Sequence, residues 1–377
     1  MRVRLGDYIK EYSVKNKNDE DIPVYSVSNS LGFCKDYFGK EVASKNKTTY
    51  KIVPRGCFAY NPSRINVGSV DWQNEEERVI VSPLYNVFSV SPLLDQQYLL
   101  YYLKSNVTLS RIRAVASGSV RDNLKLSMLY EFPIDLISLD QQYEVVSILN
   151  AVQKIIDLYQ KELSSLDELV RARFVEMFGD PIENQKDWEV VKIRDIVTDV
   201  RYGTSKPAVE GGRYPYLRMN NLTVDGGLDL SDLKYIDIPD NEIEKCVVRK
   251  GDILFNRTNS IDLIGKTAVF NLLDDMVIAG YIIRIRLNNQ ILPDVFSQYM
   301  NLEAMKKVLR GMAKGAVNQA NINAQELQSI KVYIPNMELQ KQYVEFKEEI
   351  DKSRSRIQKS LEASQELFDS LMQDYFG

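Results

Sequence analysis

The chain of 377 residues contains no histidine and only three cysteines. Without histidine, no imidazole can serve as a general base, complete a catalytic triad or bind zinc. Cys34, Cys57 and Cys246 are odd in number and far apart, so they form neither a disulfide framework nor a CxxC metal site. The sequence therefore predicts no resident metal and no imidazole-based catalysis.

Long apolar runs are also absent. No stretch of eighteen apolar residues exists that could span a bilayer. The opening residues, MRVRLGDYIKEYS, lack the apolar segment of a secretory signal. We therefore expect a soluble protein located in the cytoplasm.

What is present is one long amphipathic segment, residues 139–179, which has no proline and no glycine before its end. Its apolar residues recur in steps of three and four, which is the seam of a coiled coil and not the alternation of a strand. At about 1.5 Å per residue, such a helix would be about 60 Å long. The predicted seam residues are Val145, Leu149, Val152, Ile156, Tyr159, Leu163, Leu166, Val170, Phe174 and Met177.

A second copy of this segment ends the chain, 198 positions later, at residues 337–377. Gln142 aligns with Gln340, and Phe178-Gly179 aligns with Phe376-Gly377. Matched segments also precede each helix, among them a Gly-centred turn between apolar runs at 50–61 and again at 246–257. The chain is therefore a repeat of one design, a globular unit followed by a long helix.

These patterns predict an α+β protein with two similar mixed α/β domains joined by two long antiparallel helices. The expected boundaries are a first domain at 1–138, a central helix at 139–179, a second domain at 180–337 and a C-terminal helix at 338–377. Each Gly-centred turn should join two strands, and strand-like segments should follow at 79–88 and 276–285. Paired antiparallel, the two helices would bury their apolar stripes against each other.

The net charge of −4 is unevenly distributed along the chain. The two helical segments each carry −3, whereas residues 1–138 carry +3 and residues 180–337 carry −1. Because phosphates would be repelled by acidic helices, these helices fit a protein-docking surface better than a DNA-facing one. The charge leaves DNA binding open to the globular units.

The sequence resembles, over essentially its full length, the specificity subunits of type I restriction-modification systems. The resemblance rests on the 198-residue repeat, the helix openings LDQQYEVVSIL and MELQKQYVEF, the closing Phe-Gly, the GDILFNR segment and the loops SGSVRDNL and KGAVNQANI. It implies two target recognition domains that each read one half of a bipartite DNA sequence. It further implies that the helices set the spacer between the halves and dock two methyltransferase subunits.

The same resemblance assigns the chemistry to partner subunits. S-adenosylmethionine and adenine methylation would belong to the methyltransferases, and ATP-dependent translocation and cleavage to a motor subunit. This chain contains no Asn-Pro-Pro-Tyr or Asp-Pro-Pro-Tyr segment, no GxxxxGK[ST] and no Gly-rich dinucleotide turn. We therefore expect no enzymatic activity and no cofactor in this chain.

Side chains that could read base edges or bind phosphates gather at matched places in the two repeats. The same residue types are also good turn formers, so each residue could simply shape its loop. In the first repeat the candidates are Ser28, Lys45, Tyr60, Asn61, Arg64, Asn66, Ser119, Arg121 and Lys125. In the second they are Arg201, Lys206, Arg218, Asn220, Asn256, Arg257, Asn259, Asn318, Gln319 and Asn321.

Three other readings remain open at this stage. A structural coiled-coil protein would not require polar, Asn-rich loops at matched positions. An enzyme with two active sites would need a matched acid and base, yet its best carboxylate, Asp252, has Cys57 as its counterpart. A specificity subunit of another restriction-modification type would have the same sequence features.

Overall fold

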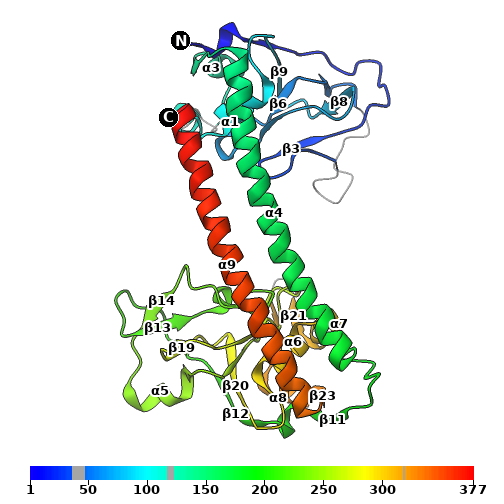
Figure 1. Cartoon of the computed structure of the whole chain (residues 1–377), viewed down its shortest axis with the longest axis vertical. Coiled ribbons are helices and arrows are strands. Elements are labelled where there is room, and N and C mark those ends of the chain that lie inside the picture. Colours follow the sequence, from blue (N-terminus) through cyan, green and yellow to red (C-terminus); the bar gives the residue numbers. More distant parts are fainter. Residues whose placement is uncertain (36–46, 117–122, 317–318) are drawn as a thin grey trace. The chain divides into compact units, whose positions relative to one another are not determined.

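The computed structural model describes residues 1–35, 47–116, 123–316 and 319–377. The chain divides into two compact units (Figure 1). Unit 1 comprises Met1–Gln160 and Lys359–Gly377, and unit 2 comprises Lys161–Gln358. Both boundaries fall within the long helices, because the core of each unit includes one part of each helix.

Unit 1 is built on a four-stranded antiparallel sheet of order β2-β9-β6-β7. Two-stranded sheets β1-β10, β3-β4 and β5-β8 accompany it. The strands are β1 (Arg2–Arg4), β2 (Ile9–Glu11), β3 (Ser26–Ser28), β4 (Gly32–Cys34), β5 (Lys51–Pro54), β6 (Phe58–Tyr60), β7 (Val70–Trp72), β8 (Arg78–Val81), β9 (Asn86–Val90) and β10 (Pro133–Asp135). The helices before the long one are α1 (Gln96–Lys104), α2 (Asn106–Ala116) and α3 (Leu126–Leu129).

Unit 2 has a four-stranded sheet of order β12-β20-β16-β18, a second of order β14-β13-β19-β15, a three-stranded sheet β17-β22-β21 and the pair β11-β23. Its first strands are β11 (Glu189–Lys192), β12 (Val197–Tyr202), β13 (Tyr214–Leu217), β14 (Lys234–Ile236), β15 (Val247–Val248), β16 (Ile253–Asn256) and β17 (Thr258–Asn259). The remaining strands are β18 (Thr267–Val269), β19 (Met276–Ile278), β20 (Ile282–Leu287), β21 (Lys314–Ala316), β22 (Gln319–Asn321) and β23 (Lys331–Ile334). The helices are α5 (Asp240–Cys246), α6 (Pro293–Asn301), α7 (Glu303–Met312) and α8 (Ala324–Ser329).

The strand order confirms the repeat. The order β2-β9-β6-β7 in unit 1 corresponds, strand for strand along the sequence, to β12-β20-β16-β18 in unit 2. The pair β1-β10 corresponds likewise to β11-β23. In each unit a strand near the start of the repeat thus pairs with the strand that leads into a long helix. The predicted α+β class with two similar domains is confirmed.

Both Gly-centred turns join two strands, as the sequence predicts. Gly56 and Gly251 have φ of +84° and +92°, the left-handed region that glycine enters at no steric cost. The flanking strands do not form a hairpin, however, because β5 pairs with β8 while β6 pairs with β7 and β9. The turn therefore passes the chain from one sheet to the next.

The two predicted strand-like segments are each divided in the structure. The segments 79–88 and 276–285 each contain parts of two strands, β8 and β9 in unit 1 and β19 and β20 in unit 2. Two helices follow in each unit, α1–α2 and α6–α7, separated at Ser105 and Leu302. Both separating residues have extended backbone angles, which ends the helical hydrogen-bond ladder.

The long helices are α4 (Leu139–Phe178) and α9 (Met337–Phe376), both of forty residues. Every predicted seam residue of α4 is buried or half-buried. In unit 1 the start of α4 packs against the end of α9, since Val145 and Leu149 share a core cluster with Met372 and Phe376. In unit 2 the end of α4 packs against the start of α9, so the two helices run antiparallel within each unit.

A buried glutamine fixes the start of each long helix in the same way. The Gln142 side chain is fully buried, accepts a hydrogen bond from Asp95 N–H at 2.8 Å and donates to the carbonyls of Leu93 and Ile137. The fully buried Gln340 side chain accepts from Leu292 N–H at 2.8 Å and donates to two carbonyls, those of Gln290 and Pro335. Each glutamine thereby ties its helix to the loop before α1 or α6.

Replacing Gln340 with Leu should lower the stability of unit 2, because two carbonyls and one N–H, all at least partly buried in these bonds, would lose their partner. A buried polar group left unsatisfied costs about 1–3 kcal/mol. The control is Gln342→Leu, the same substitution at an exposed position of the same helix. Thermal unfolding should show a lower transition for Gln340→Leu only, and equal transitions would show that this network contributes little.

Candidate nucleic-acid interface

In unit 1 the polar loop after β6 is held by its own backbone and by neighbouring elements. Asn61 Oδ1 accepts hydrogen bonds from the Ser63 backbone and hydroxyl at 3.1 and 2.8 Å. Arg113 of α2 donates from Nε to the Asn66 carbonyl at 3.2 Å. The Arg64 side chain is exposed and makes no hydrogen bond or ion pair within the described part of the chain. A free guanidinium on a fixed loop can donate to phosphate or to a base edge.

In unit 2 the equivalent cluster centres on Arg257. Its guanidinium lies 5.0 Å from the ring centroid of Tyr202 and donates from Nη2 to Asn321 Oδ1 at 2.9 Å. Asn321 Nδ2 in turn donates to the Thr258 hydroxyl at 2.8 Å. Asn259 pairs with Ala320 across strands β17 and β22, beside the exposed Gln319. The arginine is therefore held in one orientation by an aromatic face and an amide.

The two clusters occupy matched positions in the fold. In unit 1, Leu124 N–H donates to the Pro62 carbonyl at 3.0 Å, which joins the loop after β6 to the segment before α3. In unit 2, Ile322 N–H donates to the Arg257 carbonyl at 2.9 Å and joins the loop after β16 to the segment before α8. In each unit, two loops that are far apart in the sequence therefore lie together among the described residues.

Three predicted DNA contacts are wrong because their side chains are buried. Tyr60 is fully buried, and its hydroxyl donates to the Leu124 carbonyl and accepts from Asn86 Nδ2. Burial raises the pKa of this phenol well above its usual value. Asn256 is fully buried and donates to the carbonyls of Thr258 and Tyr281, and Ser28 is buried and accepts from Leu31 N–H. The hydrogen bonds of these buried side chains to backbone groups stabilise the conformation of the loops.

The other candidates of unit 2 differ in their surroundings. Arg201 is exposed and pairs with Asp199 at 2.9 Å, next to Tyr202. Lys206 pairs with Glu242 at 2.9 Å, and Arg218 pairs with Asp232 at 2.7 Å. Asn220 is exposed on the 3-10 turn Met219–Asn221. Among the described residues, no side-chain hydrogen bond or ion pair joins Asn220, Lys206 or Arg218 to Arg257.

Five predicted residues remain to be placed. Lys125 is exposed at the start of α3, next to Leu124 and so close to the Arg64 loop. The other four, Lys45, Ser119, Arg121 and Asn318, lie outside the described residues.

Sequence reasoning missed two residues of these clusters, Arg113 and Tyr281. Tyr281 is 51% exposed, and its carbonyl accepts from the Arg257 backbone at 3.0 Å. It lies in a stretch whose apolar pattern predicts a buried strand, which concealed the turn between β19 and β20. Arg113 lies on a helix, and only the fold brings it to the Asn66 carbonyl.

Asp252, the best carboxylate for an enzymatic reading, has a structural role. It is buried and accepts from Arg286 Nε at 2.9 Å and from Arg249 N–H at 3.0 Å. Its counterpart Cys57 is buried, and burial raises the pKa of that thiol. Within the residues that the structure describes, no cluster of acidic or sulfur ligands suits a metal ion, and no helix combines the length and apolarity to span a bilayer.

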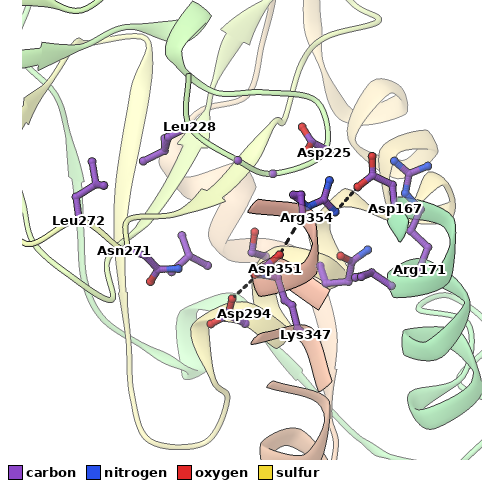
Figure 2. Close-up of a pocket in the computed structure, with 16 residues that line it drawn as sticks. Asp167, Arg171, Asp225, Leu228, Asn271, Leu272, Asp294, Lys347, Asp351 and Arg354 are labelled. Carbon is purple, nitrogen blue, oxygen red and sulfur yellow. Dashed lines mark hydrogen bonds and ion pairs between the residues drawn. The ribbon is translucent and has the colours of Figure 1, made fainter. Parts of the chain in front are cut away.

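A cavity of about 290 Å³ in unit 2 is lined by residues of α4, α6 and α9 (Figure 2). Arg354 of α9 pairs with Asp167 of α4, and Lys347 pairs with Asp294 at 3.1 Å and with Asp351 at 2.8 Å. Burial opposes the charge of Lys347, but the two carboxylates outweigh it and raise the pKa. The Arg354–Asp167 pair joins α9 to α4, and the Lys347–Asp294 pair joins α9 to α6.

Two stretches, residues 4–168 and 185–365, match the family described as "Type I restriction modification DNA specificity domain". The chain belongs to this family. Each match covers the globular elements of one repeat, which are the elements that carry the Arg64 and Arg257 clusters.

Similar curated proteins are specificity subunits. The chain is 31% identical over 198 residues to the putative type I restriction enzyme MjaX specificity subunit of Methanocaldococcus jannaschii, an alignment that covers 52% of this chain and 46% of that protein. It is 20% identical over 379 residues to the type I restriction enzyme EcoKI specificity subunit of Escherichia coli K12, covering 95% of this chain and 82% of that protein.

Solved structures of the same kind share the fold. The type I restriction-modification S subunit from M. genitalium covers the whole chain with a TM-score of 0.55 at 15% identity, and 96% of that chain is matched. A structure from work on assembly and conformational transition of a type I system gives a TM-score of 0.59, also at 15% identity, with 100% and 97% coverage. Two recognition domains linked to long helices are thus the fold of a specificity subunit.

Replacing Asn256 with Ala should destabilise unit 2, because the buried amide bonds two carbonyls and accepts from Asn259 Nδ2 at 2.8 Å. We expect a loss of about 1–3 kcal/mol in the free energy of unfolding. The control is Asn61→Ala, the repeat-equivalent and partly exposed residue, which should lose less. A larger loss at Asn61, measured by thermal unfolding, would contradict the assignment of Asn256 to the interior.

Proposed function

We propose that this chain is the non-catalytic subunit that selects the DNA sequence for a type I restriction-modification complex. One observation supports this most strongly. Both matches to the DNA specificity domain fall on units that carry an arginine on the matched loop, Arg64 on the loop after β6 and Arg257 on the loop after β16. Each unit would read one half of a bipartite DNA target, and α4 and α9 would set the unread spacer between the halves.

The chemistry of the clusters suits base reading. An arginine can donate two parallel hydrogen bonds to guanine, and Asn or Gln can do the same with adenine. Arg257 is oriented by Tyr202 and Asn321, so little side-chain entropy remains to be lost when it binds. The exposed Lys125 and Arg201 would add phosphate contacts, which position the DNA without specifying its sequence.

The long helices support a role in docking partner subunits. On α4 within unit 1, Ile148, Ile155 and Leu158 are 37%, 44% and 55% exposed, on a different face from the buried seam. Exposed apolar residues at helical spacing are typical of a surface that receives another helix. We propose two methyltransferase subunits as these partners, with a motor and endonuclease subunit in complexes that also cleave.

The proposal assigns all cofactors to those partners. S-adenosylmethionine would be bound by the methyltransferases and ATP by the motor subunit, and this chain would bind neither. The proposal also includes a cytoplasmic location, where the complex would meet its DNA.

The test is single-molecule sequencing of host DNA with the gene intact and with it deleted, scored for modified adenines. A bipartite methylated motif should disappear on deletion and return when the gene is restored. An unchanged methylome in a host whose methyltransferase is expressed would argue against the proposal and in favour of a structural coiled-coil protein.

Replacing Arg257 with Ala should relax one half of that motif and leave the other half intact. The expected cost is about 1–3 kcal/mol in binding if the guanidinium contacts a guanine. Arg64→Ala should affect the opposite half, and Arg194→Ala, at an exposed position on the turn after β11, should change neither. Sequencing of DNA selected from a random pool measures this, and an equal loss for all sequences would indicate phosphate contact instead.

A further inference from the structure

A second cavity of unit 2, of about 150 Å³, is lined by an unusual number of cations. Lys266 and Lys306 contribute from the interior, and Arg171 of α4 and Arg310 of α7 contribute from the surface. The two carboxylates on its wall are those of Asp262 and Glu303. The first turn of α7, which has no side-chain cap at Leu302, also borders the cavity.

The two lysines are deeply buried, and neither forms an ion pair with an acidic side chain among the residues that the structure describes. Lys266 is 7% exposed, and its ammonium donates to the carbonyls of Met219 and Leu222. Lys306 is 8% exposed, and it donates to the Gly265 carbonyl at 2.6 Å and to Asn301 Oδ1 at 2.7 Å. All four acceptors are neutral. An ammonium has three donors, so each lysine retains one N–H for a further acceptor.

The nearby carboxylates do not compensate these charges. Glu303 is held by the Arg310 guanidinium through two contacts of 2.9 and 3.1 Å. Asp262 is exposed and forms no ion pair with either lysine in the described part of the chain. The cavity of about 290 Å³ between α4, α6 and α9 is different, because Arg354 and Lys347 each pair with carboxylates there.

Two uncompensated ammonium groups in a cavity are costly without an anion. Burial lowers the pKa of Lys306 to about 7, and the positive charges of Arg310 and Lys266 act in the same direction against the pull of Glu303. Burial lowers the pKa of Lys266 as well. An anion in the cavity would act in the opposite direction and favour the charged form of both lysines.

We propose that this cavity binds a phosphate group between Lys266, Lys306 and Arg171. A phosphate offers several oxygens to converging N–H donors, which suits two ammonium groups, a guanidinium and the first turn of a helix. A single carboxylate would satisfy fewer of these donors. The phosphate can come from the DNA backbone or from free inorganic phosphate, and the first source rests on the proposed function.

The position of the cavity favours a link to the DNA-reading cluster. Asp262, Leu263 and Ile264 on its wall belong to the loop that begins with Arg257. Asn256 N–H donates to the Lys266 carbonyl at 2.8 Å, and Gly265 N–H donates to the Asn256 carbonyl at 2.9 Å. A phosphate held by Lys266 would thus be anchored to the same backbone that carries Arg257.

The first test is titration of the full chain with inorganic phosphate by calorimetry, at an ionic strength held constant with chloride. The wild type should bind one phosphate, and Lys306→Met and Arg171→Gln should each weaken binding at least tenfold. Lys307→Met is the matched control, because it removes the same charge from the exposed neighbouring position of α7. Arg171 is exposed, so its variant tests the cavity even if Lys306→Met fails to fold, as thermal unfolding would reveal.

The second test identifies the source of the phosphate. The affinity for the methylated motif is measured at increasing salt concentrations, and the logarithm of the binding constant is plotted against the logarithm of the salt concentration. Loss of one phosphate contact should reduce the slope of this plot by about one. A smaller slope for Lys306→Met or Arg171→Gln, with Lys307→Met unchanged, supports a backbone phosphate. Phosphate binding with unchanged slopes supports free phosphate.

The inference is overturned if the wild type binds no phosphate and neither variant alters the salt slope. Failure of the proposed function is a separate outcome. In that case the wild type would bind no DNA at all, while the phosphate titration would still decide whether the cavity is an anion site.

Discussion

Each compact unit completes its core with one part of each long helix. In unit 2, Phe174 and Phe178 of α4 pack edge-on against Tyr343 of α9, with ring centroids 5.3 and 5.5 Å apart. In unit 1, Phe376 of α9 packs against Tyr98 of α1 at 5.1 Å. Aromatic contacts of this kind add to the large area that such rings bury. The helices are therefore part of each domain's interior and not separate connectors.

This construction separates the residues that hold the fold from those that face solvent. Gln142 and Gln340 make the same three hydrogen bonds in the two repeats, and each anchors the start of a long helix. The loops after β6 and β16 are fixed by matched backbone bonds, yet their exposed side chains differ. A common scaffold with different loops suits the proposed reading of two different half-sites.

The sequence predicted the features that follow from periodicity and repetition. The seam of α4, the two forty-residue helices and the matched order of elements all depend on local spacing, which is visible in the chain. Local spacing in the sequence does not show which side chains of a loop are buried. Asn256 and Asn259 are three positions apart and chemically identical, yet only the first is fully buried. Asn256 ends β16 and pairs with Ile282 of β20, whereas Asn259 ends the short strand β17.

Local spacing in the sequence also does not show which distant strands pair with each other. The Gly56 and Gly251 turns have the spacing of a hairpin, but β5 finds its partner in β8 and β15 finds its partner in β19. Lys266 and Lys306 are forty positions apart, and no periodicity in the sequence would place both ammonium groups at one cavity. These contacts are set by tertiary packing, which overrides local propensity.

The place of Phe376 in the core of unit 1 has a consequence for the order in which the chain folds during synthesis. Most of unit 1 leaves the ribosome first, but Met372 and Phe376, which belong to its core, are translated only after all of unit 2. Domains that are continuous in sequence can fold as soon as they emerge. Here the core of the first unit remains incomplete until residues 359–377 emerge, whereas the core residues of the second, from Val170 to Tyr343, emerge earlier.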